Sequence, residues 1–143
     1  MSELLEKARS YEAKKIAATD KESKPLFHIS APAGWINDPN GFSVYNGKIH
    51  LFYQYYPYLR EWGPMHWGHS TTSDMIKWEQ LPCVMAPDEE YDKKGCFSGS
   101  AIEADGKHVL VYTGVTSIKL PDGSEQERQN QCIAFGDGLN YVK

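Results

Sequence analysis

The chain has 143 residues, the length of one ordinary domain, with 41% hydrophobic and 24% charged residues. This composition is typical of a globular protein and excludes a disordered chain. The net charge is −4 without a basic block, so nucleic acid and anionic membrane are not expected as partners. No apolar run approaches the ~18 residues that a membrane helix needs.

The first ten residues lack the apolar core of an export signal, so we expect a cytoplasmic protein. Three cysteines, Cys83, Cys96 and Cys132, lie far apart in the sequence. An odd number without close spacing argues against a disulfide framework and against a zinc site. We expect reduced, mostly buried thiols, and neither a metal nor another cofactor. His66 and His69 are expected to have a structural or substrate-contacting role rather than to bind a metal.

In chain order, the first predicted element is a helix over residues 2–19. Ser2 can cap it, and Glu3 favours its positive end. Its apolar stripe is thin, so the helix needs a surface to lie against. We expect it to pack on the outside of the main body; the alternative is a partner-binding helix. The predicted division is a helix and linker over residues 1–24, followed by a single body over residues 25–143.

The body reads as short strands joined by tight turns. Asn46-Gly47 and Asp105-Gly106 are strong hairpin signals. Residues 56–65 and 115–128 are expected to form long loops. The predicted strands are residues 41–45, 49–55, 66–72, 77–81, 98–103, 108–112 and 131–135.

These strands repeat along the chain. Gly47 and Gly106 are 59 residues apart (106 − 47), and so are Tyr53 and Tyr112 (112 − 53). A repeating four-stranded antiparallel unit is the sequence mark of a β-propeller blade. The predicted fold class is therefore all-β: about two blades of a propeller after one N-terminal helix. Because closure takes about four to eight blades, we expect the N-terminal part of a longer protein, whose unpaired blade faces offer a route to self-association.

The most informative stretch is Trp-Ile-Asn-Asp-Pro-Asn-Gly at residues 35–41. Pro39 restricts the backbone, and Asp-Pro-Asn-Gly fits a type I turn, which would hold Asp38 on a rigid corner. Trp35 and Asn37 flank the acid. A fixed carboxylate among aromatic faces and amides suits a sugar ring. The alternative is a turn whose aspartate only caps its own backbone.

The stretch resembles the nucleophile signature of glycoside hydrolase family 32, the β-fructofuranosidases. Phe-Tyr-Gln-Tyr at 52–55, Trp-Gly-Pro-Met-His-Trp-Gly-His at 62–69 and Phe-Ser-Gly-Ser at 97–100 follow in the family's order. The resemblance runs from about Pro25 to the C-terminus. It implies a five-bladed β-propeller and hydrolysis of terminal β-D-fructofuranosides by a retaining mechanism without a metal.

By this resemblance Asp38 is the catalytic nucleophile, and Asn37 is a candidate donor to it. The resemblance also implies a set of substrate-binding residues: Trp35, Asn37, Gln54, Trp62, Phe97 and Ser98. Each has a plainer alternative. Trp62 and Phe97 would be ordinary core aromatics, while Gln54 and Ser98 would be polar surface positions on strands.

Two further motifs of the family, Arg-Asp-Pro and the Glu-Cys that supplies the acid/base, do not occur in the chain. We therefore expect the chain alone to be inactive, although its parent enzyme would hydrolyse sucrose 6-phosphate or sucrose. Lys48, Arg60 and Lys77 are candidates to contact the phosphate. The alternative function is that of a non-catalytic carbohydrate-binding fragment.

Overall fold

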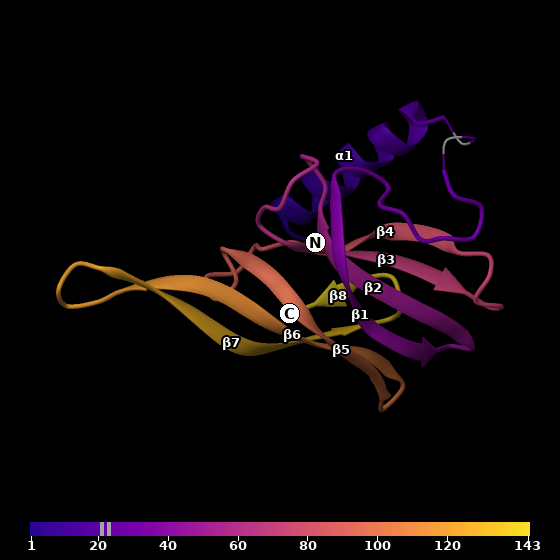
Figure 1. Cartoon of the computed structure of the whole chain (residues 1–143). Helices are drawn as coiled ribbons and strands as arrows, with labels where there is room; N and C mark the ends of the chain where they lie inside the picture. The colour runs from indigo at the N-terminus through magenta and orange to yellow at the C-terminus, as the bar shows by residue number, and fades with distance from the viewer. Residues whose placement is uncertain (21, 23) are drawn as a thin grey trace.

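The computed structural model describes residues 1–20, 22 and 24–143. It contains one helix and two four-stranded antiparallel sheets, ordered β1-β2-β3-β4 and β5-β6-β7-β8 (Figure 1). The predicted all-β fold with an N-terminal helix is confirmed. The elements are α1 (Glu3–Ala18), β1 (Trp35–Tyr45), β2 (Lys48–Tyr56), β3 (His66–Thr72), β4 (Glu79–Met85), β5 (Gly95–Ala104), β6 (Lys107–Lys119), β7 (Glu125–Gly136) and β8 (Tyr141–Val142).

Helix α1 is capped and docked as its sequence suggests. The Ser2 hydroxyl accepts a hydrogen bond from the Leu5 amide at 3.2 Å. Leu5 and Ala8 are buried, and the helix packs against β4. Arg9 reinforces this contact because its Nε donates to the carbonyl oxygen of Cys83 at 2.7 Å. The helix therefore covers the outside of the first sheet.

The two predicted hairpin turns occupy equivalent places in the two sheets. Asn46 and Gly47 have φ values of 48° and 72°, and Asp105 and Gly106 have 50° and 71°. Two consecutive residues with positive φ match a type I′ turn, whose twist suits antiparallel strands. The turns join β1 to β2 and β5 to β6. Each sheet is thus the same four-stranded meander, as the sequence repeat predicted.

The prediction of a turn corner at Asp38 was wrong. Strand β1 starts at Trp35 and runs through the whole stretch, with irregular pairing to β2 between Ile36 and Pro39 and again before Ser43. Strand β1 lies at the edge of its sheet. An edge strand tolerates the missing N–H of proline, and the irregularities take up its restricted geometry. The carboxylate is therefore positioned by a distorted strand.

A second prediction, of a long loop over residues 115–128, was also wrong. Strands β6 and β7 pair without a break to Lys119 and Glu125, and they form the long hairpin that projects at the left of Figure 1. The β-branched residues at 115, 116 and 118 favour extended backbone. The turn itself is short, with Gly123 at φ 83°.

The two sheets share one hydrophobic core. The first sheet contributes Phe52 and Trp67, and the second contributes Leu110 and Tyr112, all fully buried. Strands β1 and β5 lie next to each other across this junction. Residues near the ends of these two strands are therefore brought together although they are far apart in sequence.

A network of buried histidines joins the sheets at the same junction. Nδ1 of His50 lies 2.9 Å from Nε2 of His69. The Tyr141 hydroxyl and Nδ1 of His108 are 2.7 Å apart, and Ser43 Oγ lies 2.9 Å from Nε2 of the same ring. The Ser43 hydroxyl donates to the Gly41 carbonyl, so it accepts from Nε2–H of His108. Burial lowers the pKa of His108 to about 4, so the ring is neutral near pH 7 and its Nδ1 accepts from the Tyr141 hydroxyl.

Within the described part of the chain, no helix has the length and apolar character needed to cross a lipid bilayer. In residues 1–20, 22 and 24–143, no group of three or more histidine, cysteine, aspartate or glutamate side chains is arranged to hold a metal ion.

Candidate active site at the junction of the two sheets

The centre of the candidate site is Asp38, which is exposed on β1. The Ser98 hydroxyl, on β5, donates to its Oδ2 at 3.1 Å. Ser98 lies at an irregularity of β5, between the paired residues Phe97 and Gly99. A Cβ on Gly99 would lie 2.0 Å from the Val111 carbonyl oxygen, so only glycine permits this close approach of β5 to β6. The local backbone therefore directs Ser98 toward the carboxylate.

Trp35 and Asn37 flank the acid on β1 and are both half-buried. The indole Nε1 of Trp35 donates to Oδ1 of Asn37 at 2.8 Å. This bond fixes the indole against the amide and leaves the amide N–H groups of Asn37 for another acceptor. Among the described hydrogen bonds, the donor to Asp38 is Ser98 and not Asn37, which the sequence had suggested.

Gln54 lies beneath the site rather than on the surface, so the plainer reading of this residue as an exposed polar position was wrong. Its side chain is 3% exposed, and Nε2 donates to the carbonyl oxygen of Cys96 at 2.9 Å. One residue further along β5, the Phe97 carbonyl accepts from Nε1 of Trp67 at 3.2 Å. Two side chains of the first sheet therefore hold the β5 segment that presents Ser98.

Trp62 is not a core aromatic, because its side chain is 57% exposed. It lies in the loop between β2 and β3, and its ring meets the half-buried ring of Phe97 edge to face, with the ring centroids 6.0 Å apart. The two rings form an accessible aromatic surface next to Ser98. Such a surface suits the apolar face of a sugar.

The structure thus brings most of the predicted residues into one connected group. Ser98 contacts Asp38 directly, Phe97 is the chain neighbour of Ser98, and Trp62 contacts Phe97. Gln54 joins the group through the backbone of Cys96. Trp35 and Asn37 precede the acid on the same strand, so sequence proximity places them.

Sequence reasoning missed Trp67 and Cys96 as supports of the site. Both are fully buried, and their contribution is a hydrogen bond to or from the backbone. Trp67 lies inside the Trp-Gly-Pro-Met-His-Trp-Gly-His segment, which was the available signal. Nothing in the sequence indicated which carbonyl its indole would reach.

Chemically, the described group offers one accessible carboxylate beside aromatic faces and amides. A carboxylate in this setting can attack an electrophilic carbon or stabilise a neighbouring positive charge. The side-chain hydrogen bond described for Asp38 comes from the Ser98 hydroxyl. None of the hydrogen bonds described for Asp38 joins it to a second carboxyl group. The general acid that protonates the leaving oxygen must therefore be a residue outside this cluster of candidate residues.

Comparisons with known proteins match most of this chain to one family. The model for "Glycosyl hydrolases family 32 N-terminal domain" matches residues 28–143. Sucrose-6-phosphate hydrolase of Escherichia coli is 47% identical over 120 residues, which cover 83% of this chain and 25% of that enzyme. Levanase of Bacillus subtilis is 48% identical over 144 residues, which cover 98% of this chain and 21% of that enzyme.

Solved structures of the same family are similar to this chain. The β-fructofuranosidase BmSUC1 of Bombyx mori superposes with a TM-score of 0.82 and 43% identity, covering 96% of this chain and 28% of that one. A mutant of that protein was solved in complex with sucrose. Sucrose-6-phosphate hydrolase of Lactobacillus gasseri superposes with a TM-score of 0.73 and 33% identity. The chain spans about a quarter of the length of these relatives.

Proposed function

Because the chain belongs to glycoside hydrolase family 32, we propose that it supplies the nucleophile side of an active site that hydrolyses terminal β-D-fructofuranosides. The observation that carries the proposal is the exposed Asp38 carboxylate, which accepts a hydrogen bond from Ser98 across the junction of the two blades. The aromatic pair of Trp62 and Phe97 lies next to it. Sucrose and sucrose 6-phosphate are the proposed substrates.

In the proposed first step, an Asp38 oxygen attacks the anomeric carbon of the fructosyl unit. The glycosidic C–O bond breaks, and the leaving oxygen takes a proton from a general acid. In the second step water, activated by the same group, releases fructose and frees the carboxylate. Retaining enzymes hold the two carboxyl groups about 5–5.5 Å apart. The acid/base is proposed to come from segments that the longer relatives possess in addition.

The other candidate residues have supporting roles in this proposal. Trp35 and Asn37 border the fructosyl subsite, and the free amide N–H groups of Asn37 donate to a sugar hydroxyl. Trp62 and Phe97 cover an apolar face of the ring. Gln54 is 3% exposed and its amide is engaged with Cys96, so its role in this proposal is to position β5.

We also propose a cytoplasmic location, which the cysteines support. Cys83, Cys96 and Cys132 are all free thiols. Proteins of a reducing compartment typically keep such thiols unpaired. Residues 1–24 are proposed as an accessory helix and linker outside the propeller body.

A chimera tests the function. This chain replaces the matching part of the Escherichia coli sucrose-6-phosphate hydrolase, to which it is 47% identical, and fructose release from sucrose and sucrose 6-phosphate is measured. We expect an active chimera in which Asp38→Asn lowers kcat by about 10³ or more, because the carboxylate nucleophile is lost. The matched control is Asp105→Asn, at an exposed turn with φ 50° that asparagine also adopts. Fructose release that survives Asp38→Asn would exclude the nucleophile role.

A carbohydrate-binding role without turnover is the second candidate, and the exposed aromatic surface of Trp62 and Phe97 favours it. Calorimetry of the 143-residue chain with fructose and sucrose tests this role. Heat of binding that disappears in Trp62→Ala supports a sugar-binding surface, and the absence of heat at millimolar sugar removes this candidate.

A further inference from the structure

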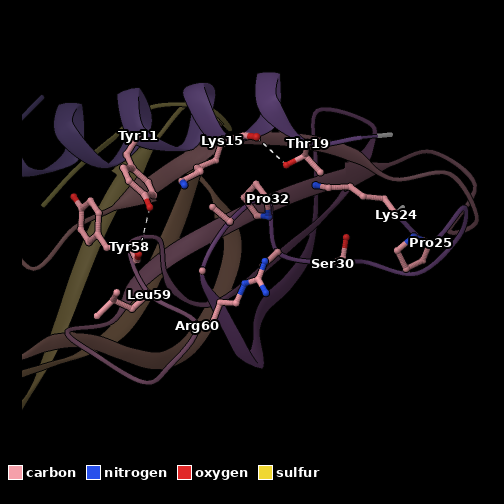
Figure 2. Close-up of a pocket in the computed structure, with 13 residues that line it drawn as sticks. Tyr11, Lys15, Thr19, Lys24, Pro25, Ser30, Pro32, Tyr58, Leu59 and Arg60 are labelled. Atoms are coloured by element: carbon pink, nitrogen blue, oxygen red, sulfur yellow. Dashed lines mark hydrogen bonds between the residues drawn. The ribbon is translucent and has the colours of Figure 1, made fainter. Parts of the chain in front are cut away.

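A cavity lies apart from the candidate active site (Figure 2). Its volume is about 390 Å³, within the range of small-molecule sites. It is open to solvent and is lined by helix α1, by the segment that precedes β1, and by the loop between β2 and β3. Arg60, a candidate phosphate contact from the sequence, lines it, whereas Asp38 and the candidate substrate-binding residues do not. The cavity is therefore a separate site, although its loop wall also carries Trp62.

Three basic side chains line this one cavity. Lys15 comes from α1, Lys24 from the segment before β1, and Arg60 from the loop after β2. Figure 2 shows the three side chains coming from these different elements, and the Lys15 ammonium lies over the Tyr11 ring, 5.4 Å from its centroid. Because the three residues are far apart in sequence, the fold has assembled this cluster.

The lining of the cavity is positively charged, and the described carboxylate on which Lys24 acts electrostatically is that of Glu12, which lies outside the lining. Among the described residues that line it, none carries a carboxylate. None of the described ion pairs involves Lys15, Lys24 or Arg60. Glu12, on the same helix, faces β4 instead, where its Oε2 accepts from the Cys83 amide at 3.0 Å. Three like charges around one space favour the binding of an anion.

Hydroxyl groups complete the polar lining. The Thr19 hydroxyl donates to the Lys15 carbonyl at 2.8 Å, which leaves its lone pairs for an acceptor role. Ser30 also lines the cavity and has no described hydrogen-bond partner, so its hydroxyl can donate to a ligand oxygen. Two ammonium groups, a guanidinium and a free hydroxyl match the tetrahedral oxygens of a phosphate group.

The walls of the cavity are fixed to one another. The Tyr11 hydroxyl donates to the Tyr58 carbonyl at 3.3 Å, and the two rings meet edge to face with centroids 5.2 Å apart. Gly34 has a φ of 61°, and a Cβ there would lie 2.0 Å from the Tyr56 carbonyl oxygen. The helix and the loop are therefore held together before any ligand arrives, which lowers the entropy lost on binding.

We propose that this cavity binds a phosphate monoester dianion, either free phosphate or a small phosphorylated sugar, through Lys15, Lys24 and Arg60. Binding does not require turnover, so it is measured on the 143-residue chain. Calorimetry uses inorganic phosphate, glucose 6-phosphate and glucose as probes. We expect both phosphates to bind and glucose not to bind. Tighter binding of glucose 6-phosphate assigns the site to a sugar phosphate, and equal binding assigns it to the phosphate group alone.

Matched variants locate the site. Arg60→Gln and Lys15→Gln should each weaken phosphate binding about tenfold, the loss of one charge-assisted contact. Lys93→Gln is the control, because Lys93 is an exposed lysine that pairs with Glu90 and does not line this cavity. It should change the affinity less than twofold. Phosphate should also raise the midpoint of thermal unfolding of the wild-type chain and of the control variant.

Two results would overturn the proposal. The first is the absence of both heat and thermal stabilisation with millimolar phosphate and glucose 6-phosphate, in a chain whose near-ultraviolet circular dichroism shows packed aromatic residues. The second is phosphate binding that Arg60→Gln and Lys15→Gln leave unchanged.

Discussion

The hydroxyl oxygen of Ser98 lies 3.1 Å from Oδ2 of Asp38, although the two residues are 60 positions apart. One belongs to the first blade and the other to the second. The proposed nucleophile therefore depends on a neighbouring blade for its described donor. Any change in the packing between the blades should alter the position of this donor.

The first prediction concerns this donor. In the chimeric enzyme, Ser98→Ala should lower kcat/KM for sucrose about tenfold, because Asp38 loses one hydrogen bond to its charged form. Ser98→Thr keeps a hydroxyl and should restore most of the rate. Ser100→Ala, at an exposed position of the same strand, is the control. Equal rates for Ser98→Ala and the control would contradict a role for this hydroxyl.

The second prediction concerns the buried amide of Gln54. Replacing it with leucine leaves the Cys96 carbonyl without its donor, in a place that water does not reach. The free energy of unfolding should fall by about 1–3 kcal/mol. Urea denaturation of the 143-residue chain measures this change. Gln126→Leu, on the exposed part of β7, should change the stability by less than about 0.5 kcal/mol; a similar loss in both variants would show that the buried bond is not responsible.

The third prediction is a loss of stability in acid. Burial lowers the pKa of His108 from 6.5 to about 4, and it lowers the pKa of His69 well below 6.5. These rings stay neutral in the folded protein, whereas the unfolded chain takes up protons as the pH falls through 6.5. The contribution of these two rings to the free energy of unfolding should therefore be constant above about pH 6.5 and decrease from there toward pH 4.

Urea denaturation at a series of pH values measures this slope. His108→Gln removes one of the titrating rings, so its stability should depend less steeply on pH between 6.5 and 4. The exposed His28 provides the control, because His28→Gln should leave the slope of the wild type unchanged. A slope that His108→Gln does not reduce would contradict the assignment to this ring.

The fourth prediction concerns Glu12, a buried residue of helix α1. Burial raises the pKa of this carboxyl from 4.5 to about 7, against the opposing effects of the Cys83 amide and of Arg9. A raised pKa means that the stability associated with the neutral form is fully present below pH 4.5 and is lost as the pH rises through about 7. Glu12→Gln keeps an acceptor for the Cys83 amide and carries no charge.

The glutamine variant should therefore gain stability relative to the wild type as the pH rises from 4.5 to 7. At pH 8 the difference should approach about 3 kcal/mol. Thermal unfolding of both proteins at pH 5 and at pH 8 measures it. A difference that is the same at both pH values would show that the carboxyl is not buried as described.

The sequence by itself determined the local features of this protein. Asn46-Gly47 and Asp105-Gly106 set the two hairpin turns, because these residues adopt positive φ at little cost. Ser2 set the start of the helix by capping a free amide. The sequence around Asp38, together with the order in which the later motifs follow it, indicated the family. All of these depend on neighbouring residues in the chain.

Only the tertiary structure decided how distant segments meet. The bonds from Ser98 to Asp38 and from Gln54 to Cys96 cross between the blades, and the basic cavity gathers side chains from three separate elements. The continuation of β6 and β7 into a long hairpin was also settled by pairing between strands. Such contacts depend on how the two sheets pack against each other. They also depend on which backbone carbonyl and amide groups remain available to hydrogen-bond with side chains. Residue spacing along one chain does not contain this information.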